Sequence, residues 1–182
     1  MAERSDVIRN RAAILDAARA LVSEPGELRL SAVAKRAGVG QGTLYRHFAD
    51  RDELLRALYE QEIDTLVALA ATLLEEHEPL EALRRWFAQL AAYARVKGGV
   101  IAAVEDSVWA DLSSRTHGKL GQALTGLLDA GSTAGVLRAD VDPRDVILLS
   151  WFLAHVEAEE WEQRVPRLLD VLLSGLRRPG LS

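Results

Sequence analysis

The chain of 182 residues has no cysteine, no long apolar run and no sustained strand pattern. The missing cysteine excludes a disulfide framework, a thiolate zinc site and a cysteine nucleophile. No run of about 18 apolar residues exists, so the sequence predicts no transmembrane helix. Because the first residues also lack the apolar stretch of a secretory signal, we expect a cytoplasmic protein with no membrane partner.

Patterns that carry catalysis or bind cofactors are absent as well. The sequence holds no Gly-rich phosphate loop, no repeated Glu-x-x-His pair and no recognisable set of Ser, His and Asp. His155 and Glu159 have the i, i+4 spacing of metal ligands, but two ligands are too few, and we interpret them as a surface or interface pair. We therefore predict no metal, no cofactor and no enzyme activity.

Apolar residues make up 49% of the chain, which suffices for a sizeable core. Apolar positions recur at helical spacing throughout, whereas alternation of period two is not sustained. We therefore predict an all-α fold of about nine helices.

Capping and breaking signals set the predicted helix boundaries. Asp50 and Glu53 resemble a capping box that opens a long helix reaching about His77. Gly98-Gly99 is expected to interrupt the helical pattern. The other predicted helices are 6–23 with Ser5 as its cap, 31–37 with Ser31 as its cap, 41–47, 79–97, 100–106, 107–130, 143–158 starting at Pro143, and 160–176.

Charge is distributed unevenly along the chain. The net charge is -5, but residues 1–56 carry +2 and residues 57–182 carry -7. The window Leu28–Ala49 holds four basic residues and no acidic one. A polyanion such as DNA would be tolerated at this window and repelled by the acidic remainder, which would orient the molecule on it.

The acid-free window also has the pattern of two short helices joined by a tight turn. Ala34 is small enough to let the second helix approach the first, and Gly38 can adopt the positive φ that the turn needs. The residues expected to fill the space between the helices are Val33, Ala37, Val39 and Leu44. These features predict a helix-turn-helix.

The second short helix would direct polar side chains outward, and these are Gln41, Thr43, Arg46 and His47. A major groove admits one helix, in which glutamine can bridge adenine, threonine can touch a thymine methyl group, and arginine can bridge guanine. The alternative is a buried helical hairpin with a solvated polar face. The spacing, the acid-free window and the outward donors together favour DNA binding.

Two runs, Gly42-Thr43-Leu44-Tyr45-Arg46-His47-Phe48 and Asp50-Arg51-Asp52-Glu53-Leu54-Leu55, resemble the TetR family of bacterial regulators. The resemblance covers roughly Ile8–Leu58, and Ala134–Pro143 is similar to the loop before that family's dimerisation helices. It implies that residues 1–52 form a three-helix DNA-binding head, in which residues 41–47 are the recognition helix. It also implies that residues 53–182 form a C-terminal helical bundle with an effector pocket and a homodimer interface.

The resemblance further implies which side chains contact DNA bases or phosphates. These are Ser31, Gln41, Gly42, Thr43, Tyr45, Arg46, His47 and Arg51. Ser31 would use its hydroxyl and the N-terminus of its helix, and Arg51 would touch the backbone. Arg4, Arg9 and Arg11 are further candidates for minor-groove or phosphate contacts. Phe48 is interpreted as a core residue rather than a base-stacking one.

Beyond the head, the predicted walls of the effector pocket are Trp86, Phe87, Leu90, Tyr93, Val104 and Trp109. The alternative is that these residues are ordinary core, which is the commoner role of aromatics at helical spacing. The predicted dimer interface comprises Trp151, Ala154, His155, Trp161, Leu168, Leu169 and Leu172.

Three functions remain open from the sequence. The leading hypothesis is a homodimeric regulator, expected to be a repressor, that leaves a near-palindromic DNA operator when an apolar or aromatic small-molecule effector binds. The second is an all-helical enzyme or small-molecule carrier with an incidental helical hairpin. The third is a DNA-binding protein that responds to no effector, which a sequence without a visible pocket does not distinguish from the first.

Overall fold

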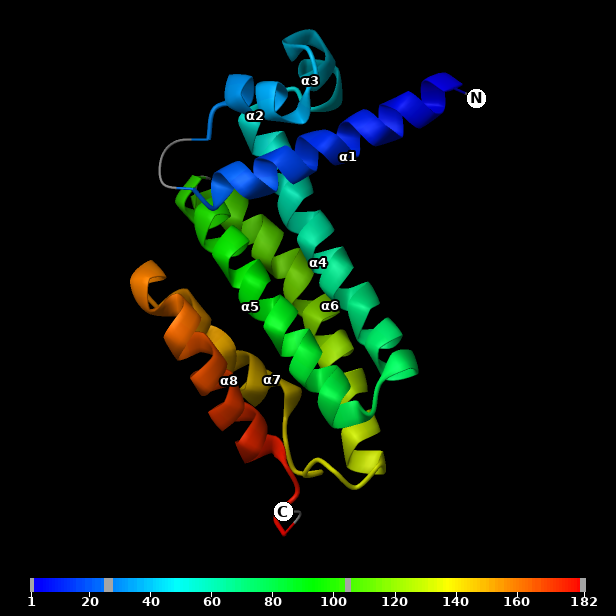
Figure 1. Ribbon diagram of the computed structural model, residues 1–182, viewed down its shortest axis with the longest axis vertical. Coiled ribbons are helices and arrows are strands. Elements are labelled where there is room, and N and C mark those ends of the chain that lie inside the picture. The colour runs from blue at the N-terminus through cyan, green and yellow to red at the C-terminus, as the bar shows by residue number, and fades with distance from the viewer. Residues whose placement is uncertain (1, 25–27, 104–105, 181–182) are drawn as a thin grey trace. The chain divides into compact units, whose positions relative to one another are not determined.

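The computed structural model describes residues 2–24, 28–103 and 106–180 (Figure 1). Within these ranges there are eight α-helices, two short 3-10 helices and no strand, which confirms the all-α prediction. The elements are α1 (Ala2–Val22), α2 (Leu30–Ala37), α3 (Gln41–His47), α4 (Arg51–Glu76), α5 (Pro79–Ala103), α6 (Asp106–Thr133), α7 (Pro143–Leu149), η1 (Ser150–Ala154), η2 (Ala158–Glu160) and α8 (Trp161–Leu176). No helix among them is long and apolar enough to cross a membrane.

The chain divides into two compact units, each of which draws on α4, α5 and α6. The head unit comprises residues 1–62 and 95–113, and the bundle unit comprises residues 63–94 and 114–182. In the head unit, Ile14 and Leu15 of α1 and Leu58 of α4 are fully buried. The two long helices therefore supply the core on which the short helices α2 and α3 rest.

A glycine turn joins α2 to α3, as predicted. Gly38 ends α2 with a φ of 69°, in the left-handed region that favours glycine. The N–H groups of Gly38 and Val39 donate to Lys35 O at 3.3 Å and Ala34 O at 3.0 Å. These two bonds satisfy the last carbonyl groups of α2 and fix the direction in which the chain leaves it.

Side-chain caps open two helices. The predicted capping box is confirmed, because the Glu53 N–H donates to Asp50 Oδ1 at 2.8 Å. Glu53 Oε2 in turn accepts the N–H of Ala49 at 2.7 Å. The Asp142 side chain caps α7, which begins at Pro143 as predicted.

The prediction that Ser31 caps α2 is wrong. The helix begins at Leu30, and Arg29 is the N-cap residue, so Ser31 lies exposed within the first turn. Leu28 just before the cap and Val33 in the second turn are both buried, which is the arrangement of a hydrophobic staple. Burial of these two side chains sets the start of α2 ahead of the serine.

Three other predicted boundaries are also wrong. Helix α1 starts at Ala2, the second residue of the chain, so Ser5 lies inside the helix and does not cap it. Helix α5 runs through Gly98-Gly99 instead of breaking into two helices. Glycine in a helix costs only about 1 kcal/mol relative to alanine, and Val96 and Val100, one turn apart, are both buried. The burial of these valines outweighs the weak helix propensity of the glycines.

The third boundary concerns the predicted helix 143–158. Its α-helical part ends at Leu149, and the chain continues as the 3-10 helix η1. The Ser150 hydroxyl donates to Ile147 O at 2.7 Å. A serine that bonds a carbonyl of the preceding turn competes with the regular helical ladder, which accounts for the change at this position.

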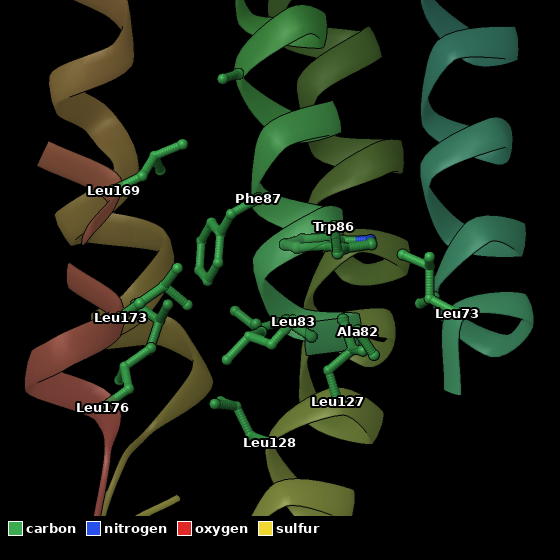
Figure 2. Packing of buried hydrophobic residues seen from close by; sticks show 14 of the residues in the cluster. Leu73, Ala82, Leu83, Trp86, Phe87, Leu127, Leu128, Leu169, Leu173 and Leu176 are labelled. Atoms are coloured by element: carbon green, nitrogen blue, oxygen red, sulfur yellow. The ribbon is translucent and has the colours of Figure 1, made fainter. Parts of the chain in front are cut away.

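The bundle unit is built around neighbouring aromatic residues on α5 (Figure 2). The Trp86 indole N–H donates to Leu66 O at 2.9 Å, so its polar group is satisfied in the core. Phe87 lies on the other side of α5, facing Leu169 and Leu173 of α8 (Figure 2). The two rings meet edge to face with centroids 5.6 Å apart. Together they fill the space on both sides of α5.

Replacing Gly38 tests the turn. Gly38→Ala should destabilise the protein by about 1–2 kcal/mol, because alanine is strained at positive φ. No atom lies within 4 Å of the added Cβ, so the effect would come from the backbone alone. Gly126→Ala, in the middle of α6 and equally unobstructed, is the matched control. It should stabilise by up to about 1 kcal/mol. Thermal unfolding compares the two, and equal stabilisation would contradict the account of the turn.

Candidate nucleic-acid interface

Helix α3 presents a polar face because one side of it is anchored in the core. Leu44 is buried, and the Phe48 residue that ends the helix is 2% exposed, which confirms that Phe48 is a core residue. Thr43 and His47 are half-buried, whereas Gln41, Gly42 and Arg46 are exposed. Tyr45 is 53% exposed. The α3 residues predicted to contact DNA are therefore all exposed or half-buried.

Arg46 folds back onto its own helix. Its Nε donates to Gly42 O at 3.2 Å, and its Nη2 donates to Thr43 Oγ1 at 3.3 Å. Both bonds are long and exposed, and such bonds contribute about 1 kcal/mol or less each. A base edge or a phosphate would therefore displace them readily, and the guanidinium can turn outward from α3.

Neither α2 nor α3 contains an acidic residue in its first turn. Free N–H groups and the dipole make a helix start attractive to an anion. Ser31, although it is not the cap, is exposed in the first turn of α2, so its hydroxyl is available beside those groups. This geometry suits the phosphate contact expected of Ser31.

Arg51 stands at the first position of α4 and is half-buried. Its Nε is buried and has no hydrogen-bond partner in the described part of the chain. Its neighbours Asp50 and Glu53 are engaged with backbone N–H groups in the capping box. Arg51 thus keeps hydrogen-bonding capacity that the folded head does not use.

An ion pair ties α1 to α4 within the head unit. Arg19 Nε lies 2.5 Å from Glu62 Oε1, and Arg19 Nη1 lies 2.7 Å from Asp16 Oδ1. Partial burial lowers the pKa of Arg19, but hydrogen bonds and charge from Glu62 and Asp16 outweigh it and raise the pKa overall. This arginine is neutralised by carboxylates, unlike Arg46 of α3.

The predicted pocket residues lie in or beside the bundle core. Trp86, Phe87 and Tyr93 are buried, and Leu90 packs half-buried against the same cluster. The remaining predictions, Val104 and the side chain of Trp109, lie outside the described residues. The described members therefore have a packing role.

Five large apolar side chains of α7, η1 and α8 are exposed, and we call this set the apolar face. Its members are Leu148, Leu149, Trp151, Leu168 and Val171, of which Leu149 is 61% and Val171 70% exposed. Single exposed apolar residues are common on a monomer, whereas a contiguous exposed apolar patch is typical of a surface that binds a partner.

The predicted interface residues divide between this face and the core. Trp151 and Leu168 lie on the apolar face, and Leu172 is half-buried. Leu169 faces inward with the core of the bundle. The sequence interpretation omitted Leu148, Leu149 and Val171. The period of α8 held a signal for Val171, because the inward positions are Val165, Leu169, Leu173 and Leu176.

Of the other predicted interface residues, His155 is exposed, and its Nδ1 lies 3.0 Å from Trp151 O, one turn back. Trp161 is half-buried at the start of α8. The side chain of Ala154 lies outside the described residues.

Comparisons with known proteins match both parts of the chain. Residues 14–58 match the family model described as bacterial regulatory proteins, tetR family. Residues 78–178 match the one described as transcriptional regulator SbtR-like, C-terminal domain. A TetR transcriptional regulator from Streptomyces coelicolor is 35% identical with a TM-score of 0.82, and the match covers 93% of this chain and 99% of that one.

A TetR transcription regulatory protein from Mycobacterium vanbaalenii is 31% identical with a TM-score of 0.78, and the match covers 96% of this chain and 99% of that one. Among curated proteins, an HTH-type transcriptional regulator from Staphylococcus aureus is 36% identical over 66 residues, or 35% of this chain. The match spans 36% of that relative's length.

Substitutions on α3 test the candidate interface. Arg46→Ala should weaken DNA binding about tenfold or more, because a charged donor is lost. Tyr45→Phe should weaken it by a few-fold, because one hydroxyl is removed. Both side chains are exposed, so thermal stability should not change. Fluorescence anisotropy with labelled duplex DNA measures the affinity.

The matched control is Arg84→Ala, which removes an exposed arginine of α5 that pairs with Glu81 in the bundle unit. This change should leave DNA affinity as it is. Unchanged affinity in both α3 variants, or an equal loss in the control, would contradict the assignment.

Proposed function

Since the chain belongs to the TetR family of bacterial regulatory proteins, we propose that it is a homodimeric repressor of a near-palindromic operator, released by a small-molecule effector. Family membership makes it a DNA-binding transcriptional regulator of the helix-turn-helix class. This membership argues against the all-helical enzyme or carrier that the sequence left open.

The observation that carries operator binding is the accessible, acid-free side of α3. Gln41, Thr43 and Arg46 can offer donors and acceptors to base edges in a major groove. Phosphates would be bound by Tyr45, His47, Ser31 and Arg51. Such contacts fix the register of the protein on the duplex without reading the DNA sequence. In this proposal, specificity comes from a few base contacts, and affinity comes largely from phosphates.

The apolar face supports dimerisation with a second copy. Leu149, Trp151 and Val171 are each more than half exposed, and covering them would remove large apolar area from water. A twofold axis pairs identical faces, so one copy supplies the complement to the other. The two recognition helices would then read half-sites about 34–36 Å apart, or somewhat more, which explains the expected near-palindrome.

Release by an effector is the least direct part of the proposal. The support is the composition of the bundle unit, which buries Trp86, Phe87 and Tyr93. Aromatic side chains of this kind suit an apolar or aromatic ligand. Such a molecule would lower operator affinity only if it bound the released state more tightly than the DNA-bound state. A regulator that responds to no effector remains the alternative, and a small-molecule screen against operator binding distinguishes the two.

DNA binding can be measured directly on the purified protein. We expect it to bind a duplex from the DNA upstream of its own gene more tightly than a scrambled duplex of equal length, with a steep decrease in affinity as salt rises. A folded dimer that binds no DNA at either sequence would contradict the proposal.

The dimer interface can be tested by charge insertion. Leu149→Glu together with Val171→Glu should give monomers in sedimentation velocity, because each copy would bury uncompensated carboxylates. Ile8→Glu is the matched control, as Ile8 is 66% exposed but lies on α1 in the head unit. It should remain dimeric. A dimer in the double variant, or a monomeric wild type, would contradict the assignment of this face.

A further inference from the structure

The arginines of the head unit differ in whether a carboxylate neutralises them. Arg9 pairs with Asp6, and Arg36 lies 3.0 Å from Glu24. Arg11, two residues after Arg9 on the same helix, is exposed and forms no ion pair with any described residue. From the sequence, Arg9 and Arg11 were equal candidates for DNA contacts. In the structure, Arg9 has a carboxylate partner and Arg11 has no described one.

Arg11 is instead held by an aromatic ring. Its Cζ lies 5.4 Å from the centroid of the Phe48 ring. Phe48 is a rigid support, because it is buried and its N–H donates to Leu44 O at 2.9 Å where α3 ends. The contact therefore places the guanidinium beside the C-terminal end of the recognition helix. His47, a predicted phosphate ligand, adjoins the same ring with centroids 6.3 Å apart.

A contact with an aromatic ring leaves an arginine without a neutralising partner and therefore able to bind an anion. A guanidinium has five N–H donors, and contact with one aromatic ring does not cancel its charge. No described carboxylate occupies these donors, and the window Leu28–Ala49, which contains Phe48, has no acidic residue. The planar fork of arginine matches the geometry of a phosphate group.

We propose that Arg11 is a further DNA-binding residue, whose guanidinium, positioned by the Phe48 ring, binds a backbone phosphate next to the recognition helix. The inference rests on the proposed operator binding and adds α1 to the surface that touches DNA. Phe48 acts through Arg11 and is a positioning residue. Arg9, already neutralised by Asp6, contributes little in comparison.

Salt-dependent binding of the full-length dimer tests the proposal. The probes are a duplex from the DNA upstream of the protein's own gene and a scrambled duplex of the same length. Arg11→Ala should weaken binding to both by about tenfold or more. The logarithmic salt slope should decrease by about 0.9 for each Arg11 on DNA, hence by nearly 2 for a dimer. Arg11→Lys keeps the charge and should retain most of the slope.

The matched control is Arg84→Ala, which removes an exposed arginine that pairs with Glu81 in the bundle unit and should change neither affinity nor slope appreciably. An unchanged slope in Arg11→Ala while the wild type binds would overturn this inference alone. Equal losses in both alanine variants, or a loss confined to one duplex, would do the same. Absence of binding by the wild type would overturn the proposed function as well.

Phe48→Leu tests the positioning role. It should lower affinity and slope in the wild-type background but add no further loss in the Arg11→Ala background. Thermal unfolding of each variant measures any damage to the core. An equal loss of affinity in both backgrounds would show that Phe48 acts on the fold and not through Arg11.

Discussion

The burial of Leu44 and Phe48 is the constraint on which the DNA-binding surface depends. Helix α3 spans only Gln41–His47, and a helix this short is not stable by itself in water. Its structure comes from the core beneath it and from the Gly38 turn before it. Since one side of α3 must face inward, the other side is fixed outward, with Gln41 and Arg46 on it. The outward orientation of the proposed DNA-binding side chains thus follows from packing.

Charge is sorted within the head unit. Arg19 and Arg36 pair with carboxylates, whereas Arg11 and Arg46 do not pair with any described one. An arginine already neutralised gains less from a phosphate than one that is free. The acidic Asp50 and Glu53 lie next to the acid-free window, but their oxygens accept backbone N–H groups at the start of α4. Structural carboxylates and arginines without a described carboxylate partner therefore coexist in one small unit.

The bundle unit uses its apolar residues in two ways. On α8, Leu169 and Leu173 turn toward the core around Phe87, while Leu168 and Val171 remain exposed. A helix with apolar residues on two sides buries only one of these sides against its own bundle. Association with a second copy would cover the outer side. The proposed dimer and the packed core thus share one helix.

The sequence by itself determined the helical class, the Gly38 turn, the capping box at Asp50 and the outward polar side of residues 41–47. These depend on local spacing and on backbone conformations that few residues adopt. Only the tertiary structure decided where α2 begins, that α5 continues through its glycines, and which leucines of α8 face inward. Those outcomes depend on burial against residues distant in the chain, as does the placement of Arg11 over Phe48. Local signals carry no information on such contacts, because the partners meet only after folding.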